Sequence, residues 1–159
     1  MLDEELTEEA FALRPFFIIA CLALAACGNY PRDVSGTLDR IESSRKFTVG
    51  LAALRPVDHA KARALIARLE RATGARATVD AGPLESQLAR LEAGELDLVV
   101  AEIAEDSPWT APVAVIEPLS VRREGERTLG LSAVAANGEN QWIAAIERQV
   151  RDSLAKPHA

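Results

Sequence analysis

Histidine, cysteine and aromatic residues are scarce in this sequence. Its 159 residues include two histidines and two cysteines, and aromatic residues make up 4% of the chain. One histidine, His158, lies in the C-terminal tail, so the usual zinc site and the usual His-based catalytic site both lack ligands. Ser132 lacks the second glycine of a nucleophile elbow and has no histidine partner. We therefore expect neither an enzyme nor a metal or cofactor site.

Positive charge is also in deficit. Eighteen lysines and arginines stand against 24 aspartates and glutamates, which gives a formal net charge of −6. No predicted helix or strand gathers lysine and arginine on one face, as a nucleic-acid-binding element would. The composition therefore excludes nucleic acid as an expected partner.

One long apolar run, residues 15–27, carries no charge. A transmembrane helix needs about 20 apolar residues, so this run is too short, and its length is typical of the core of a secretory signal. It ends in Leu24-Ala25-Ala26-Cys27, which resembles the lipobox of bacterial lipoproteins. The acidic residues before the run are unusual for a signal and favour a translation start near Leu13. The alternative is a buried apolar helix of the folded domain.

The lipobox resemblance implies that Cys27 is lipidated, with palmitate among its acyl chains, and becomes the mature N-terminus. We therefore expect a membrane-anchored protein of the bacterial cell envelope that faces the periplasm. Cys21 leaves with the signal, so the folded domain holds no disulfide. The predicted divisions are a signal segment over 1–27, a tether over 28–34, one folded lobe over 35–155 and a tail over 156–159.

The folded lobe is organised around the stretch Leu96–Ile103. This stretch is nearly continuous apolar sequence, rich in β-branched residues, with Gly94 before it and a polar loop after it. Those features favour a strand that is covered on both faces, as in a parallel sheet.

Strands and helices alternate ahead of this stretch, and right-handed crossovers predict the strand order 2-1-3. A C-terminal β-hairpin and an amphipathic helix, with Trp142 and Leu154 facing inward, are expected after it. We predict a three-layer α/β/α sandwich whose mixed, mainly parallel sheet has about five strands. The other expected elements are the strand Phe47–Leu51, the helix His59–Thr73 with Asp58 as its N-cap, the strand Ala77–Val79, the helix Leu84–Leu91, the segment Val113–Val121 interrupted by Pro118, the charged turn Arg122–Arg127, the strand Leu129–Ala135 and a helix opened by Glu139 and Asn140.

Five pieces of the chain occur in an order that resembles a known family: Gly36–Ile41, Phe47–Leu51, the helix Leu84–Leu91, Ala93–Val100, and Leu129–Ala135 with Asn137–Asn140. This family is the family 3 extracellular solute-binding proteins, the amino-acid type of ABC-transporter receptors. The resemblance implies one lobe of a type II periplasmic binding protein. The family has a whole second lobe where this chain has the charged turn Arg122–Arg127, so no closure of two lobes around a ligand is expected.

A ligand of such a sheet is expected beyond the carboxyl ends of its strands, where the strand order reverses. Arg55, after the first strand, is the nearby cation. In amino-acid receptors the loop after the central strand supplies a threonine and an arginine for the ligand's α-carboxylate. Here that loop has acids and no arginine, so an amino-acid carboxylate is not the expected ligand. The candidate ligand-binding loop residues are Glu105, Asp106, Ser107, Trp109 and Thr110.

The alternative for this loop is structural: Trp109 covers the end of the sheet, and Asp106 or Ser107 caps a local turn. Three functions follow for the whole chain. The first is a lipid-anchored, non-enzymatic binding protein that takes a small solute, contacts a membrane transporter component, or does both. The second is a protein-interaction or regulatory module, with a second copy of the chain among its possible partners. The third is a receptor lobe that has lost its ligand.

Overall fold

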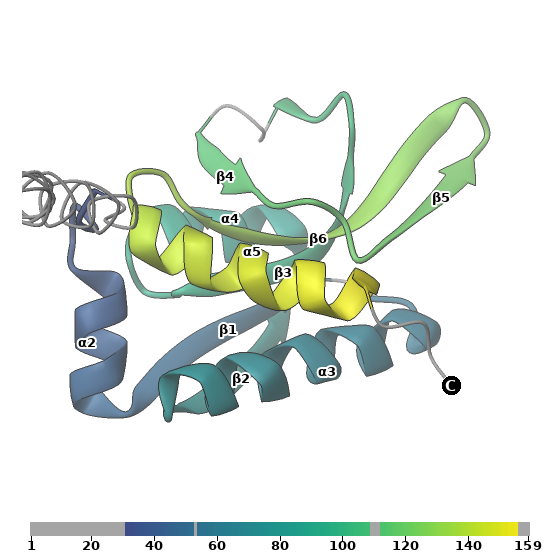
Figure 1. Ribbon diagram of the computed structural model, residues 1–159. Coiled ribbons are helices and arrows are strands. Elements are labelled where there is room, and N and C mark those ends of the chain that lie inside the picture. The colour runs from purple at the N-terminus through teal and green to yellow at the C-terminus, as the bar shows by residue number, and fades with distance from the viewer. Residues whose placement is uncertain (1–30, 53, 109–111, 156–159) are drawn as a thin grey trace, which may run out of the picture. The chain divides into compact units, whose positions relative to one another are not determined.

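A six-stranded sheet forms the centre of the folded lobe in the computed structural model (Figure 1). The strands are β1 (Lys46–Ala52), β2 (Arg76–Gly82), β3 (Leu98–Ala104), β4 (Val113–Val115), β5 (Ser120–Glu124) and β6 (Arg127–Ala136). β1 lies between β2 and β3 and is parallel to both. β6 runs antiparallel to β3 and pairs with β4 and β5 along its other edge. The predicted order 2-1-3 and the C-terminal hairpin are confirmed.

Helices cover both faces of this sheet. They are α2 (Thr37–Ser44), α3 (Pro56–Thr73), α4 (Leu84–Glu92) and α5 (Asn140–Ala155). α3 and α5 pack side by side on one face, and α4 packs on the other (Figure 1). The predicted three-layer α/β/α arrangement is therefore confirmed.

The structure describes residues 31–52, 54–108 and 112–155, all within the compact unit Pro31–Ala159. Several predictions fall outside the described residues: the signal and lipobox with Cys27, the first residues of the tether, Trp109 and Thr110, and the tail 156–159.

The central strand β3 contributes to both cores because successive side chains of a strand point to opposite faces. Leu98 and Val100 pack under α3 and α5, whereas Val99, Ala101 and Ile103 pack on the α4 side. All five are buried. The continuous apolar pattern of β3 therefore corresponds to a strand that is covered on both faces, as predicted.

Two carboxylates near the chain's two ends join α2 to α5. Glu139, only 3% exposed, accepts the backbone N–H of Ser35 at 2.7 Å and that of Thr37 at 3.0 Å. Asp33 accepts the backbone N–H of Gln141 at 2.6 Å and that of Leu38 at 2.9 Å. Each carboxylate satisfies donors that a helix start leaves free. The motifs around Gly36 and Glu139 therefore have a structural role, which fixes where α2 and α5 begin.

Three sequence-based details differ from the structure. α3 begins at Pro56, and Arg55 rather than Asp58 is the N-cap, because proline suits the first helical position and Asp58 is buried against Arg55. The charged turn narrows to Gly125 and Glu126, since the flanking residues pair across the hairpin as β5 and β6. Leu154 is 46% exposed because it lies in the last turn of α5.

Candidate functional site

Arg55 lies at the predicted position, between the end of β1 and the start of α3. Its side chain is 43% exposed and donates from Nε to Asp58 Oδ2 at 2.8 Å. Nε is also 3.3 Å from Glu102 Oε1 on β3. Arg55 therefore binds two internal carboxylates, and its predicted contact with a ligand stays a prediction.

Glu102 has a stronger partner in Arg122 of β5. Arg122 donates from Nε to Glu102 Oε1 at 2.6 Å and from Nη2 to Oε2 at 3.0 Å, a two-pronged pairing. Glu124 is a second partner of the same guanidinium, at 3.3 Å. The hydrogen bond from Arg122 holds the pKa of Glu102 below its ordinary value against the opposing effect of burial. The sequence analysis missed this pair, although Glu102 is the one charged residue inside β3.

We expect Glu102→Gln to destabilise the protein in a pH-dependent way. A carboxylate whose pKa is lowered by folding contributes stability above its unfolded pKa, near 4.5, and loses it as pH falls through the folded value. At pH 7 the variant should lose about 1–3 kcal/mol of unfolding free energy, because the neutral glutamine amide is a poorer hydrogen-bond acceptor for Arg122 than the carboxylate is. Urea unfolding at pH 7 and at pH 3 measures this difference. Glu126→Gln, at the exposed turn of the hairpin, is the control, and an equal loss at both pH values would contradict the prediction.

The loop after β3 begins with a tight turn. The backbone N–H of Ser107 donates to Ala104 O at 3.0 Å, and that of Glu105 donates to Thr128 O at 3.1 Å. Asp106 is exposed, as is the side chain of Glu105. Of the candidate loop residues that the structure describes, Glu105 lines a pocket, and Asp106 and Ser107 lie outside its lining.

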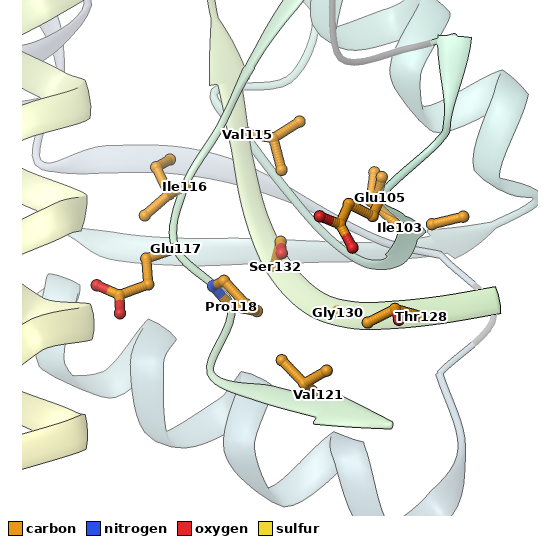
Figure 2. A pocket seen from close by; sticks show the side chains of 11 residues that line it. Ile103, Glu105, Val115, Ile116, Glu117, Pro118, Val121, Thr128, Gly130 and Ser132 are labelled. Atoms are coloured by element: carbon orange, nitrogen blue, oxygen red, sulfur yellow. The ribbon is translucent and has the colours of Figure 1, made fainter. Parts of the chain in front are cut away.

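This pocket lies beside the end of β3, on the face of the sheet that carries α4, and has a volume of about 420 Å³ (Figure 2). Its walls are mostly apolar, with two hydroxyls and two carboxylates among them. We call it the β3-end pocket. It is lined by Ile103, Ala104, Glu105, Val115, Ile116, Glu117, Pro118, Val121, Thr128, Gly130 and Ser132.

The segment between β4 and β5 closes one side of the β3-end pocket by running along the edge of β6. Ile116 and Leu119 hold it there, since their backbone N–H groups donate to Ala133 O at 2.9 Å and Leu131 O at 2.8 Å. Gly130 lets the segment approach closely: a Cβ at that position would lie 3.0 Å from Pro118 Cβ. The proline that interrupts the apolar segment was the one sequence signal for this wall.

Ser132 supplies the buried polar group of the β3-end pocket. Ser132 is only 3% exposed, and Figure 2 shows its side chain in the middle of the labelled lining residues. Within residues 31–52, 54–108 and 112–155, we find no hydrogen bond of its hydroxyl. The hydroxyl is not among the fully buried unpartnered side-chain atoms of the described residues, so it is open to the pocket, where a ligand or a water can bond to it.

A second cavity of about 480 Å³ lies at the carboxyl ends of β1 and β2. His59 is the only ionisable side chain in its lining, which otherwise consists of Leu51, Leu54, Ala81, Gly82 and Pro83. It therefore offers fewer polar contacts than the β3-end pocket does.

In the described part of the chain, no group of three or more His, Cys, Asp or Glu residues could hold a metal ion. The helices described there include none that is both long and apolar enough to cross a bilayer.

No protein-family model matches this chain, and no curated protein matches its sequence. Solved structures do resemble its fold, which is that of one lobe of a periplasmic binding protein. The Phe57Trp mutant of the arginine-bound form of domain 1 from TmArgBP, the ArgBP of T. maritima, has a TM-score of 0.64 at 16% identity and covers 75% of this chain and 99% of its own. An ancestral cationic amino acid solute-binding protein, AncCDT-1, has a TM-score of 0.62 at 9% identity, with coverage of 75% and 93%. The L-cystine solute receptor of Neisseria gonorrhoeae reaches 0.58 at 11% identity, with coverage of 75% and 91%.

Proposed function

We propose that this protein is a single-lobe solute-binding protein that takes a small solute in the β3-end pocket. The observation that carries the proposal is the pocket itself: about 420 Å³, mostly apolar walls, and the Ser132 hydroxyl in its lining, with no hydrogen bond among the described residues. Ligand sites are typically concave and mostly apolar, with a few polar groups that orient the ligand. The pocket also lies at the carboxyl end of β3, and ligands of parallel α/β sheets bind beyond the carboxyl ends of the strands.

Binding by one lobe has support among the structural neighbours. Domain 1 of TmArgBP by itself is described as arginine-bound, and this chain matches 99% of that domain. In our chain the hairpin of β5 and β6 follows the pocket in place of a second lobe. A solute would therefore be held by the walls of the pocket rather than by closure of two lobes. We infer membership in the family 3 solute-binding proteins on the same grounds of motif order and fold.

We further propose that the role is binding without chemistry. The neighbours named above are binding proteins, although AncCDT-1 is also described as a precursor of cyclohexadienyl dehydratase. Ser132, the only serine in the pocket lining, has no histidine in that lining to act as its base.

A lipid on Cys27 would hold the lobe at the membrane of the bacterial envelope. The segment 28–34 would act as the tether, and the lobe would begin at residue 35. In this arrangement the protein would pass its solute to a membrane transporter component. The lipobox at Leu24–Cys27 and the solute-binding fold support this proposal together.

A flat apolar surface around the strand ends would have favoured the protein-interaction module instead. Pro56 and Pro108 are exposed there, but Leu54 packs against the core beneath α3. The hollow beside β3 is a better match to a small molecule than to a protein surface. Solute binding is therefore our first proposal.

The test is a thermal-shift screen of the full chain in detergent against amino acids, amines and polyamines, small carboxylates and sugars. A solute that binds only the folded state adds about 2.7 kcal/mol of stability at a hundredfold excess over its Kd. Val121 lines the pocket but is 59% exposed, so Val121→Trp should fill the pocket without disturbing the core.

We expect the shift to be abolished by Val121→Trp and weakened by Ser132→Ala. Val57→Trp is the matched control, because Val57 is also 59% exposed but lies on α3, outside the pocket. A flat screen with a folded protein, or a shift that Val121→Trp leaves intact, would contradict solute binding in this pocket.

A further inference from the structure

Glu105 brings an uncommitted carboxylate to the β3-end pocket. Its backbone is held beside β6 by the hydrogen bond to Thr128 O at 3.1 Å. Among the described residues, its side chain makes no hydrogen bond and no ion pair. Figure 2 shows this carboxylate directed toward the pocket, on the side where Ser132 lies. A free carboxylate beside an apolar hollow is a binding group for a cation.

Arg122 and Arg55 are not available to the pocket. A third arginine near this end of the sheet, Arg123, lies on the same face of β5 as Val121 and opposite Thr128, but outside the lining. Val121 lines the pocket, so its neighbour Arg122 points to the opposite face of β5. There it is paired with Glu102 and Glu124. Arg55 is paired with Asp58 and Glu102 in the same way. No lysine, arginine or histidine is present in the lining.

A solute that carries a carboxylate would therefore find no positive partner among the lining residues. It would instead approach two negative side chains, Glu105 and Glu117, although Figure 2 shows the Glu117 carboxylate directed away from the centre. The remaining walls, among them Ile103, Val115 and Val121, favour a hydrocarbon body. Ser132 can accept one hydrogen bond from the solute.

We propose that the β3-end pocket selects a small organic cation without a carboxylate, such as an alkylamine or an arylalkylamine. Its ammonium group contacts Glu105 and its hydrocarbon body contacts Val115 and Val121. This inference rests on the proposed function and adds the chemical class of its solute. It also separates this chain from its neighbours, whose names refer to amino acids, since every amino acid carries a carboxylate.

The experiment compares solutes with one hydrocarbon body and different charges. Phenethylamine, phenylalanine and 3-phenylpropionate form one series, and isoamylamine, leucine and 4-methylpentanoate form another. Isothermal titration calorimetry of the full chain in detergent, with micelles alone as the blank, measures each Kd. We expect the amine of at least one series to bind at least tenfold more tightly than its amino acid and its acid.

Glu105→Gln should weaken amine binding about tenfold, the loss of one charge-assisted contact, which corresponds to 1.4 kcal/mol. Asp106→Asn is the matched control, because it removes the same charge from the next residue, outside the pocket lining, and should change Kd less than twofold. The Glu105 side chain is exposed, so its variant should fold.

Two kinds of failure are distinguishable. If the amino acid or the acid binds as tightly as the amine and Val121→Trp blocks it, solute binding stands and cation selection is wrong. Equal effects of Glu105→Gln and Asp106→Asn would also overturn the role of Glu105. If no solute of either series binds, and none in the thermal-shift screen does, both proposals are wrong.

Discussion

Replacing Trp142 by alanine is expected to lower the free energy of unfolding by about 3–5 kcal/mol, the range for deleting a buried large aromatic side chain. Trp142 is fully buried in α5. Its ring packs edge-on against Phe47 of β1, with ring centroids 5.8 Å apart and planes at 65°. Its Nε1 donates to Asp97 O at 2.7 Å. The variant therefore loses both a large packing volume and the partner of a buried carbonyl.

Urea unfolding of the wild type and two Trp142 variants separates these contributions. Trp142→Phe keeps an aromatic ring but leaves the Asp97 carbonyl unpaired, which should cost about 1–3 kcal/mol. Leu154→Ala is the control on the same helix, and since Leu154 is 46% exposed, its effect should stay within about 0.5 kcal/mol. A loss below about 1 kcal/mol for Trp142→Ala would contradict the central position of this residue in the core.

The hydrogen bond from Trp142 to Asp97 has effects beyond α5, because Asp97 also bonds to residues of β1 and α2. One carboxylate oxygen accepts the backbone N–H of Thr48 at 2.7 Å and its hydroxyl at 3.0 Å, and the other pairs with Arg40 of α2. Backbone and side chain of one residue thus connect β1, α2 and α5 at the start of the central strand. Removing Trp142 weakens this connection at its buried side.

Replacing Cys27 by serine is expected to release the protein from the membrane fraction completely. A serine cannot carry the thioether-linked lipid, and several acyl chains together give the firm attachment that one chain does not. Cell fractionation with palmitate labelling measures both the position and the lipid.

Cys21→Ser is the matched control for this experiment. Cys21 lies in the same apolar run as Cys27, but six residues earlier and outside the lipobox. The control should remain labelled and bound to the membrane. Retention of the Cys27→Ser protein in the membrane fraction, or palmitate labelling of it, would contradict the lipoprotein proposal.

The order of strands was predictable because it depends on local patterns. Leu96–Ile103 is apolar on both faces, and the stripe Leu84, Leu88 and Leu91 before it is helical. Alternation of such segments, together with right-handed crossovers, leaves few topologies. The ends of the elements were less predictable. β2 extends to Gly82 because it pairs with β1 up to that residue. α3 begins at Pro56 because Asp58 is held by Arg55 and does not act as the N-cap.

The candidate site was predicted only in part. Glu105 was expected near a ligand and does line the β3-end pocket. Ser132 was considered only as a nucleophile, and Glu117 and Pro118 were not considered as site residues. Glu105, Ser132 and the pair Glu117 and Pro118 come from three separate segments, and their approach depends on how the β4–β5 connection runs along β6. No spacing in the sequence predicts that path.

The sequence by itself determined the α/β class, the strand order, the two-sided burial of β3 and the apolar run that ends in Cys27. Each of these follows from the periodicity or composition of one contiguous segment. Only the tertiary structure decided that Arg55 and Arg122 bind Glu102, that Glu139 accepts the backbone N–H of Thr37 at the start of α2, and that Glu105 and Ser132 share a pocket. Those pairings join residues far apart in the chain, and which carboxylate stays free depends on how every nearby charge is paired in three dimensions.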